Sequence, residues 1–204
     1  MTYTPIANGD IAAIVTSLEM TARPPLRPMP GGELRLERWE APALEKYRLL
    51  YRRVGEPWLW FSRLVMPDAE LAAIIHHPDV MIWAVTDRRG IEVGILELDF
   101  RDTGQCELAF FGLIPALNGK GHGRWLMAMA LQAAWARKEV ERVWVHTCSL
   151  DAPGALGFYI KSGFVPYQRQ LETFPDPRLS GHLPRDAAPQ IPIIEQDAIS
   201  HAPL

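Results

Sequence analysis

Residues 113–126 read LIPALNGKGHGRWL, an apolar run that passes into three alternating glycines and then into an amphipathic segment. Glycine adopts positive φ angles and has no Cβ, so successive backbone N–H groups of such a loop can converge on one anion. The helix expected after the loop adds unpaired N–H groups and the positive end of its dipole. Lys120 and Arg124 place two cations beside it. The stretch therefore predicts a pyrophosphate-binding loop between a strand and a helix.

Two common nucleotide-binding loops do not fit this spacing. A Rossmann loop needs Gly-x-Gly-x-x-Gly, but counting from Gly119 the last position is Arg124. Counting from Gly121, the last position is Leu126. A Walker loop needs a first glycine separated by four residues from Gly-Lys, and then Ser or Thr. Here Ile114 stands at the position of the first glycine and Gly121 at that of the Ser or Thr. The loop is therefore of another kind.

The composition is that of an ordinary globular protein. The chain has 204 residues, of which 48% are hydrophobic and 22% charged, enough for one domain with a full core. The formal net charge of -3 argues against a nucleic-acid partner held by bulk electrostatics. Cys106 and Cys148 lie in expected strands and form no Cys-x-x-Cys pair, as is typical of small buried side chains in a reducing compartment. We expect a cytoplasmic protein.

Neither a metal site nor a membrane span is expected. The histidines and carboxylates show no metal-ligand spacing, and the adjacent His76 and His77 would point to different sides of a helix. The apolar run from Ile11 to Leu18 is too short to cross a bilayer and has no basic region before it.

The chain divides into three expected parts. Residues 1–32 hold one strand-like run, 14–20, and then four prolines, so we expect an extended N-terminal arm laid on the domain. Residues 33–174 form the expected domain, and residues 175–204 a proline-rich tail that packs on it or is flexible. The arm and the tail either close a cleft or cover sheet edges.

Hydrophobic periodicity and turn residues give the order of elements in the domain. Strands are expected over residues 34–39, 80–86, 91–100, 105–114, 143–148 and from 165, and helices over 42–54, 69–77, 121–138 and 153–162. A change of apolar phase between Ile95 and Leu96 indicates a bulge in the strand that holds them. The order predicts an α/β fold with a mixed sheet.

In this order of elements the chain resembles the GNAT superfamily of N-acetyltransferases, which use acetyl-coenzyme A (acetyl-CoA). The similarity covers residues 34–173 and is sharpest over 107–164. Residues 118–123 resemble the coenzyme A loop of the family, Gln/Arg-x-x-Gly-x-Gly/Ala, with the departure that Asn118 stands where Gln or Arg is usual. Residues 151–164 resemble the helix signature Ala-x-x-x-Tyr-x-x-x-Gly-Phe. The resemblance implies a mostly antiparallel mixed sheet flanked by helices.

The resemblance also implies a donor site for acetyl-CoA as co-substrate, with no metal. The residues implied to bind it are Leu113 and Ile114 along the pantetheine arm, and Asn118, Gly119, Lys120, Gly121, His122, Gly123 and Arg124 around the pyrophosphate. Tyr159 lies four residues after Ala155, on the same helical face. The resemblance implies that its hydroxyl is the general acid near the sulfur, while the alternative is a core aromatic with a hydrogen-bonded hydroxyl.

Glu107 is the candidate base. It alternates with Ala109 and Phe111 along its strand, so we expect these side chains to share the face where the thioester lies. The histone-modifying branch of the family has a catalytic glutamate in a similar place, whereas the alternative is a solvated charge at the start of a strand. His146, in the middle of its strand, is a rival base or a buried structural histidine.

An aromatic cluster follows the first helix, in the region that shapes the acceptor site of the family. It comprises Trp58, Trp60 and Phe61, with Glu56 beside it. One carboxylate among aromatic faces suits an ammonium ion, and the alternative is simple packing.

We therefore expect an enzyme that transfers an acetyl group from acetyl-CoA to a primary amine of a small molecule or peptide by direct attack on the thioester. The alternatives are a non-catalytic acyl-CoA sensor on the same fold and an acyltransferase that uses a longer acyl-CoA. A homodimer is implied only by analogy with the family.

Overall fold

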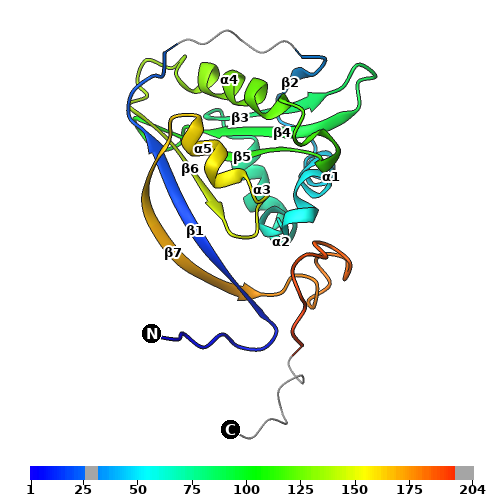
Figure 1. Cartoon of the computed structure of the whole chain (residues 1–204). Helices are drawn as coiled ribbons and strands as arrows, with labels where there is room; N and C mark the ends of the chain where they lie inside the picture. Colours follow the sequence, from blue (N-terminus) through cyan, green and yellow to red (C-terminus); the bar gives the residue numbers. More distant parts are fainter. Residues whose placement is uncertain (26–31, 196–204) are drawn as a thin grey trace, which may run out of the picture.

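The computed structural model describes residues 1–25 and 32–195 (Figure 1). Residues 26–31 of the expected arm and 196–204 of the expected tail lie outside the described residues. The strands are β1 Asp10–Met20, β2 Arg35–Trp39, β3 Val80–Thr86, β4 Glu92–Asp99, β5 Gln105–Leu113, β6 Arg142–Cys148 and β7 Val165–Pro175. The helices are α1 Leu44–Gly55, η1 Glu56–Trp58, α2 Ser62–Val65, α3 Asp68–Ile75, η2 Pro115–Leu117, α4 His122–Ala134 and α5 Ala155–Lys161.

The seven strands form one sheet in the order β2-β3-β4-β5-β6-β1-β7. Five of the neighbouring pairs are antiparallel, and β5 and β6 pair in parallel, with α4 as the crossover between them. A parallel pair needs such a long connection, whereas the β3–β4 hairpin needs a short turn. The expected mixed, mostly antiparallel sheet flanked by helices is confirmed.

Each face of the sheet packs against its own helices. On one face Leu126 and Met127 of α4 lie in a core with Leu96 and Leu98 of β4. On the other face Tyr47 and Leu50 of α1 pack against β3 and β4, and Figure 1 shows α1, α2 and α3 on the side of the sheet away from α5. Full burial of one such apolar side chain contributes about 1.5–3 kcal/mol, so both layers hold the sheet firmly.

Burial of β4 from both sides explains one failed prediction. Ile95 faces α1 and Leu96 faces α4, so consecutive apolar residues occur in this strand without any break at that point. The irregularity of β4 lies earlier, where Val85 pairs with Gly94 and Thr86 with Glu92. The bulge predicted between Ile95 and Leu96 was therefore wrong in position.

Residues 10–20, which the sequence analysis assigned to an arm, form β1 between β6 and β7. Val15 pairs with Cys148 on one side and with Gln170 on the other, and Leu18 is fully buried. In Figure 1, β1 and β7 run side by side as a long curved pair along one edge of the sheet. The backbone N–H and C=O groups of this segment therefore find their hydrogen-bond partners inside the sheet.

The described part of the tail, residues 176–195, folds around one buried arginine. The Arg178 guanidinium pairs with Asp176 at 2.7 Å and donates to the carbonyls of Ala187 at 3.1 Å and Ile191 at 2.8 Å. Leu183, Ala187 and Ala188 pack against Leu59 in a small apolar cluster. The tail thereby supports the segment between α1 and α2 from behind.

Candidate active site

A cleft opens where β5 and β6 separate. Their parallel ladder runs from Gln105 and Arg142 to Glu107 and Trp144 and then stops, although both strands continue. Beyond that point lies a cleft of about 970 Å³ whose walls include residues from both faces of the sheet. The divergence of the strands therefore makes a passage through the sheet.

A bulge in β5 shapes this passage. Leu98 pairs with Leu108 and Glu97 with Phe110, which leaves Ala109 without a partner in the ladder. The extra residue shifts the phase of the strand, so that Phe111 packs with the core on the α4 side. The expectation that Glu107 and Phe111 share a face was therefore wrong. Glu107 pairs across the sheet with Asp99, on the face toward α1.

The glycine loop forms one end of the cleft. Gly119 and Gly121 have φ angles of +73° and +84°, a region that L side chains rarely adopt. A Cβ at Gly119 would meet no heavy atom within 4 Å, and one at Gly121 would meet only Arg124 Nη2 at 3.4 Å. The side of the loop that a side chain would fill is open, and α4 begins at His122 directly behind it. These residues fit a phosphate group that takes N–H hydrogen bonds.

Most of the implied donor-site residues line the cleft. Those that do are Leu113, Asn118, Gly119, Gly121, Gly123 and Arg124. Ile114, Lys120 and His122 do not contribute to its wall. The Ile114 N–H donates to the carbonyl of Val93 at 2.9 Å, which ties the end of β5 to β4.

Tyr159 lies in the wall of the cleft on the α4 side. It is buried, and its ring is 6.2 Å from that of Phe111, 5.7 Å from that of Phe158 and 6.0 Å from that of Phe164. Burial raises the pKa of its hydroxyl above the ordinary value, and the charge of Asp151 adds to this. Among the described residues the hydroxyl has no hydrogen-bond partner. It therefore retains its proton at neutral pH and is free to donate it.

Glu107 and His146 meet in the cleft on the opposite side of the sheet from Tyr159. His146 Nδ1 lies 3.5 Å from Glu107 Oε1. The Glu107 carboxylate raises the pKa of His146 above its usual value, against the opposing effect of burial. The sequence analysis treated the two residues as rivals, and the structure brings them together.

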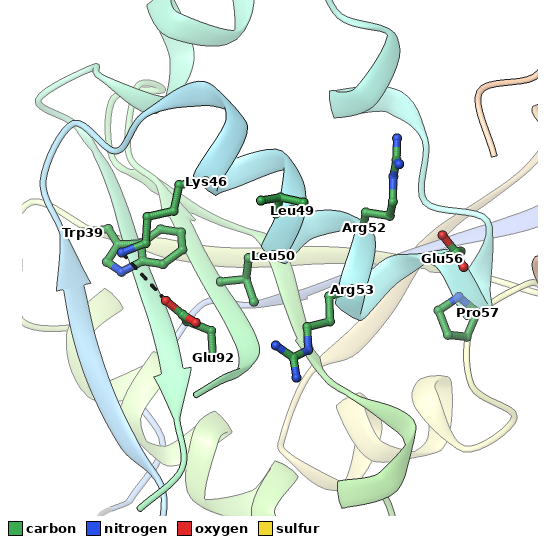
Figure 2. A pocket seen from close by; sticks show the side chains of 9 residues that line it. All are labelled: Trp39, Lys46, Leu49, Leu50, Arg52, Arg53, Glu56, Pro57 and Glu92. Atoms are coloured by element: carbon green, nitrogen blue, oxygen red, sulfur yellow. Dashed lines mark ion pairs between the residues drawn. The ribbon is translucent and has the colours of Figure 1, made fainter. Parts of the chain in front are cut away.

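The predicted aromatic cluster is divided by the structure. Trp58, Trp60 and Phe61 line the cleft. Glu56 instead lines a separate surface groove of about 590 Å³ beside α1, where Figure 2 shows it at the end away from Trp39. Glu56 is therefore not placed to share a ligand with the three aromatic residues.

Trp60 is held tightly in its position. A Cβ on Gly55 would lie 2.4 Å from the Trp60 side chain, and a Cβ on Gly112 would lie 3.2 Å from it. The ring also contacts Tyr51 at 5.7 Å and Phe110 at 5.3 Å between centroids. Because it needs glycines on both sides, Trp60 is part of the wall and cannot swing freely.

Asp151 is a cleft residue whose importance the sequence analysis missed. Its Oδ2 accepts hydrogen bonds from Thr147 Oγ1 at 2.6 Å and from the Cys148 N–H at 3.0 Å. Its Oδ1 accepts from Trp60 Nε1 at 3.3 Å. The sequence showed Asp151 only as the start of the motif that contains Tyr159.

A buried ionic group supports the cleft from below. Glu97 is fully buried and accepts hydrogen bonds from Tyr47 Oη at 2.6 Å and Arg63 Nη2 at 2.8 Å. Burial raises the pKa of Glu97, and Arg63 and Tyr47 oppose that rise. Arg63 itself lines the cleft and lies over the ring of Phe110. No spacing in the sequence links these three residues.

Within residues 1–25 and 32–195, no group of three or more His, Cys, Asp and Glu side chains is arranged to hold a metal ion. In the same part of the chain, no helix has the length and apolar character needed to cross a membrane.

The acetyltransferase (GNAT) family model matches residues 38–164, which include the glycine loop, the diverging strands and Tyr159. The match covers more than half of the chain, and the chain therefore belongs to the acetyltransferase (GNAT) family. No curated protein matches the sequence.

Solved structures share this fold. A GCN5-related N-acetyltransferase from Kribbella flavida is 17% identical with a TM-score of 0.52, over 85% of this chain and 63% of that one. A second, from Sphaerobacter thermophilus, is 16% identical with a TM-score of 0.55, over 79% and 51%. An aminoglycoside acetyltransferase from an uncultured soil metagenomic sample is 20% identical with a TM-score of 0.51, over 64% and 88%. This chain therefore spans less than two thirds of the Kribbella and Sphaerobacter proteins.

Proposed function

We propose that the protein transfers an acetyl group from acetyl-CoA to a primary amine of a small molecule or peptide, by direct attack of the amine on the thioester. One observation carries the proposal. A single cleft joins the glycine loop and Tyr159 on one face of the sheet to Glu107 and His146 on the other. Donor and acceptor can thus enter from opposite sides and meet between the separated strands.

The glycine loop suits the pyrophosphate of the donor. Its positive-φ glycines leave space where a side chain would otherwise stand, the N-terminus of α4 adds a positive dipole, and Arg124 adds a charge. The end of β5, near Leu113, lies along the path that the pantetheine arm would follow from this loop into the passage. Acetyl-CoA itself supplies an activated acyl group on a good leaving thiolate.

One proton transfer would then take place on each face of the sheet, to the leaving sulfur on one and from the amine on the other. Tyr159 is the proposed acid, since burial keeps the proton on its hydroxyl at neutral pH and so leaves it available to the sulfur as the C–S bond breaks. The candidates for accepting the proton of the amine are Glu107 and His146, which lie in contact with each other in the cleft. Both proton transfers are general acid–base catalysis, which typically increases the rate about 10²–10⁴-fold for each group.

The charges of the cleft favour a cationic acceptor. Among its acidic side chains, Asp99 is neutralised by Arg101 at 2.6 Å. Glu107, Asp151 and Glu172 also line the cleft, and among the described residues none of them has an arginine or lysine ion pair. Trp60 adds an aromatic face on the same side. Carboxylates and aromatic faces together attract an ammonium group.

Both cysteines are free thiols, in keeping with the cytoplasmic location that we propose.

The test is release of coenzyme A thiol from acetyl-CoA in the presence of a panel of primary amines, with mass spectrometry of the acetylated product. We expect turnover of cationic amines. The variant Arg124→Gln should raise the KM for acetyl-CoA, while Lys138→Gln, an exposed lysine on the turn after α4, should leave it unchanged. Binding of acetyl-CoA without turnover of any amine would favour the sensor, and turnover only of longer acyl-CoA would change the donor.

A further inference from the structure

The contact between Glu107 and His146 is made at the point where the sheet opens. Glu107 is the last residue of β5 that pairs with β6, and His146 lies two residues beyond its partner Trp144. The two side chains therefore face each other across the start of the passage, with 3.5 Å between Oε1 and Nδ1. The parallel register fixes this geometry, because one residue of slip would turn either side chain to the other face.

The two side chains are not equally accessible. The His146 side chain is 51% exposed and that of Glu107 is 24% exposed. The imidazole uses Nδ1 toward Glu107, and within the described residues Nε2 has no hydrogen-bond partner. Nε2 is thus the nitrogen left free for a ligand, while Glu107 lies behind the ring.

The groups around His146 come from four parts of the chain besides β1, whose Ser17 pairs with it in the ladder. Among the described residues, the charged groups that most affect the pKa of His146 are anionic. Glu107 approaches from β5, Asp151 from the turn after β6 and Glu172 from β7. The fourth is its own strand, where the Trp144 ring lies 6.2 Å away. Asp99, across the ladder from Glu107, is already paired with Arg101. These surroundings favour the protonated imidazole, so His146 is a stronger base than an isolated histidine.

We propose that His146 is the catalytic residue that accepts the proton of the acceptor amine through Nε2, and that Glu107 is a positioning residue that orients the ring through Nδ1. This inference rests on the proposed function and decides between the two groups that it leaves open. A carboxylate on one ring nitrogen fixes the tautomer and stabilises the imidazolium that forms on the other.

Acetyl transfer forms one C–N bond and breaks one C–S bond. The amine lone pair forms the C–N bond to the carbonyl carbon, and one N–H proton passes to His146 Nε2. The C–S bond breaks, and the sulfur takes the proton of the Tyr159 hydroxyl. The imidazolium then returns its proton, and the tyrosinate regains one, through solvent in the cleft. The net products are the amide and coenzyme A.

The sign of the pH dependence follows from this assignment. Neutral His146 is the active form, so kcat/KM falls as the pH drops through its pKa, which the Glu107 carboxylate raises above the usual histidine value. Loss of the Glu107 charge lowers that pKa and moves the acid limb of the profile to lower pH. If Glu107 were itself the base, its replacement would instead remove activity at every pH, with no shift of the acid limb.

The experiment combines NMR titration of the histidine Cε1–H signals with pH profiles of kcat/KM. The proteins are the parent, Glu107→Gln and His146→Gln, with His182→Gln on the exposed tail as the control. The acceptor is the least basic amine that the panel turns over, so that its own titration lies outside the range. The Cε1–H signal that is absent from the spectrum of His146→Gln is assigned to His146.

We expect the His146 pKa above 6.5 in the parent and lower in Glu107→Gln, with the acid limb of kcat/KM moving by the same amount. His146→Gln should lose about 10²-fold or more in kcat and show no acid limb. The proposal is overturned if the His146 pKa is unchanged by Glu107→Gln, or if Glu107→Gln is inactive at all pH values while His146→Gln keeps the parent profile. A parent without turnover refutes the proposed function separately, because the NMR titration needs no substrate.

Discussion

Trp60 Nε1 donates a hydrogen bond to Asp151 Oδ1 at 3.3 Å and so joins two segments that lie 91 residues apart in sequence. One segment follows α1 and carries the aromatic wall of the cleft, and the other follows β6 and leads into the helix of Tyr159. The aromatic wall and the helix that carries Tyr159 are therefore held together across the cleft.

Asp151→Asn should weaken this connection. Asparagine has one oxygen acceptor, whereas Asp151 accepts from three donors, so at least one donor is left facing an amide NH₂. We expect a loss of about 1.5–3 kcal/mol in the free energy of unfolding, measured by urea denaturation, and a higher KM for the amine. Asp186→Asn, on the exposed tail, should change stability by less than about 0.5 kcal/mol. Equal effects of the two substitutions would contradict this role of Asp151.

Glu97→Gln should be among the most destabilising substitutions near the cleft. It leaves the Arg63 guanidinium buried without its counter-charge, and removal of one partner of a buried pair costs about 3–5 kcal/mol. Tyr51→Phe is the control, because it removes only neutral hydrogen bonds, with Ser62 Oγ and from the Arg63 backbone, worth about 1 kcal/mol each. Urea denaturation measures both, and a similar loss for the two variants would show that the ionic pair is not what supports the wall.

Arg178→Met should release the described tail from the domain. It leaves Asp176 buried and unpaired and removes the donors to four backbone carbonyls, so we expect a loss of about 3–5 kcal/mol or local unfolding of the tail. Limited trypsin digestion, followed by mass spectrometry, should then cut at Arg185. In the control Arg185→Met only the exposed pair with Glu195 is lost, and stability should stay within about 1 kcal/mol. A tail that stays protected in Arg178→Met would contradict the account.

Tyr159→Phe should lower kcat about 10²-fold or more while the Kd for acetyl-CoA stays the same, since the ring and its packing are kept. The raised pKa of Tyr159 has a further consequence for the parent enzyme. The acid must be protonated, so its ionisation should cause no loss of activity below about pH 10, the ordinary value for tyrosine. A basic limb near neutral pH that disappears in Tyr159→Phe would show that the hydroxyl ionises far more easily than its burial allows.

The order of elements was predictable because it depends on local signals. Glycines and prolines mark the ends of helices, and periodicity separates α4 from the strands on either side. The glycine loop and the helix of Tyr159 were found for the same reason. The end of α4 was predicted wrongly. The helix ends at Ala134, although residues 135–138 continue the helical pattern.

The contacts between distant segments were not predictable in this way. Residues 14–20 have the composition of a strand, but no local signal shows that they pair between β6 and β7. The bulge at Ala109 depends on pairing with β4, and it reversed the expected face of Phe111. Likewise the contact between Glu107 and His146 follows from the register of two strands that are separated by a whole helix.

Calorimetric titration with acetyl-CoA tests the central claim most directly. The proteins are the parent, Gly121→Glu and the control Gly157→Glu, which places the same side chain in open space on α5, outside the cleft. Gly121→Glu fills the phosphate site with bulk and negative charge, at a backbone strain of about 1–2 kcal/mol that thermal melting will register. The account predicts saturable binding to the parent and to Gly157→Glu, and none to a folded Gly121→Glu. No binding to the parent, or equal binding to all three proteins, would contradict the assignment of this loop to the donor.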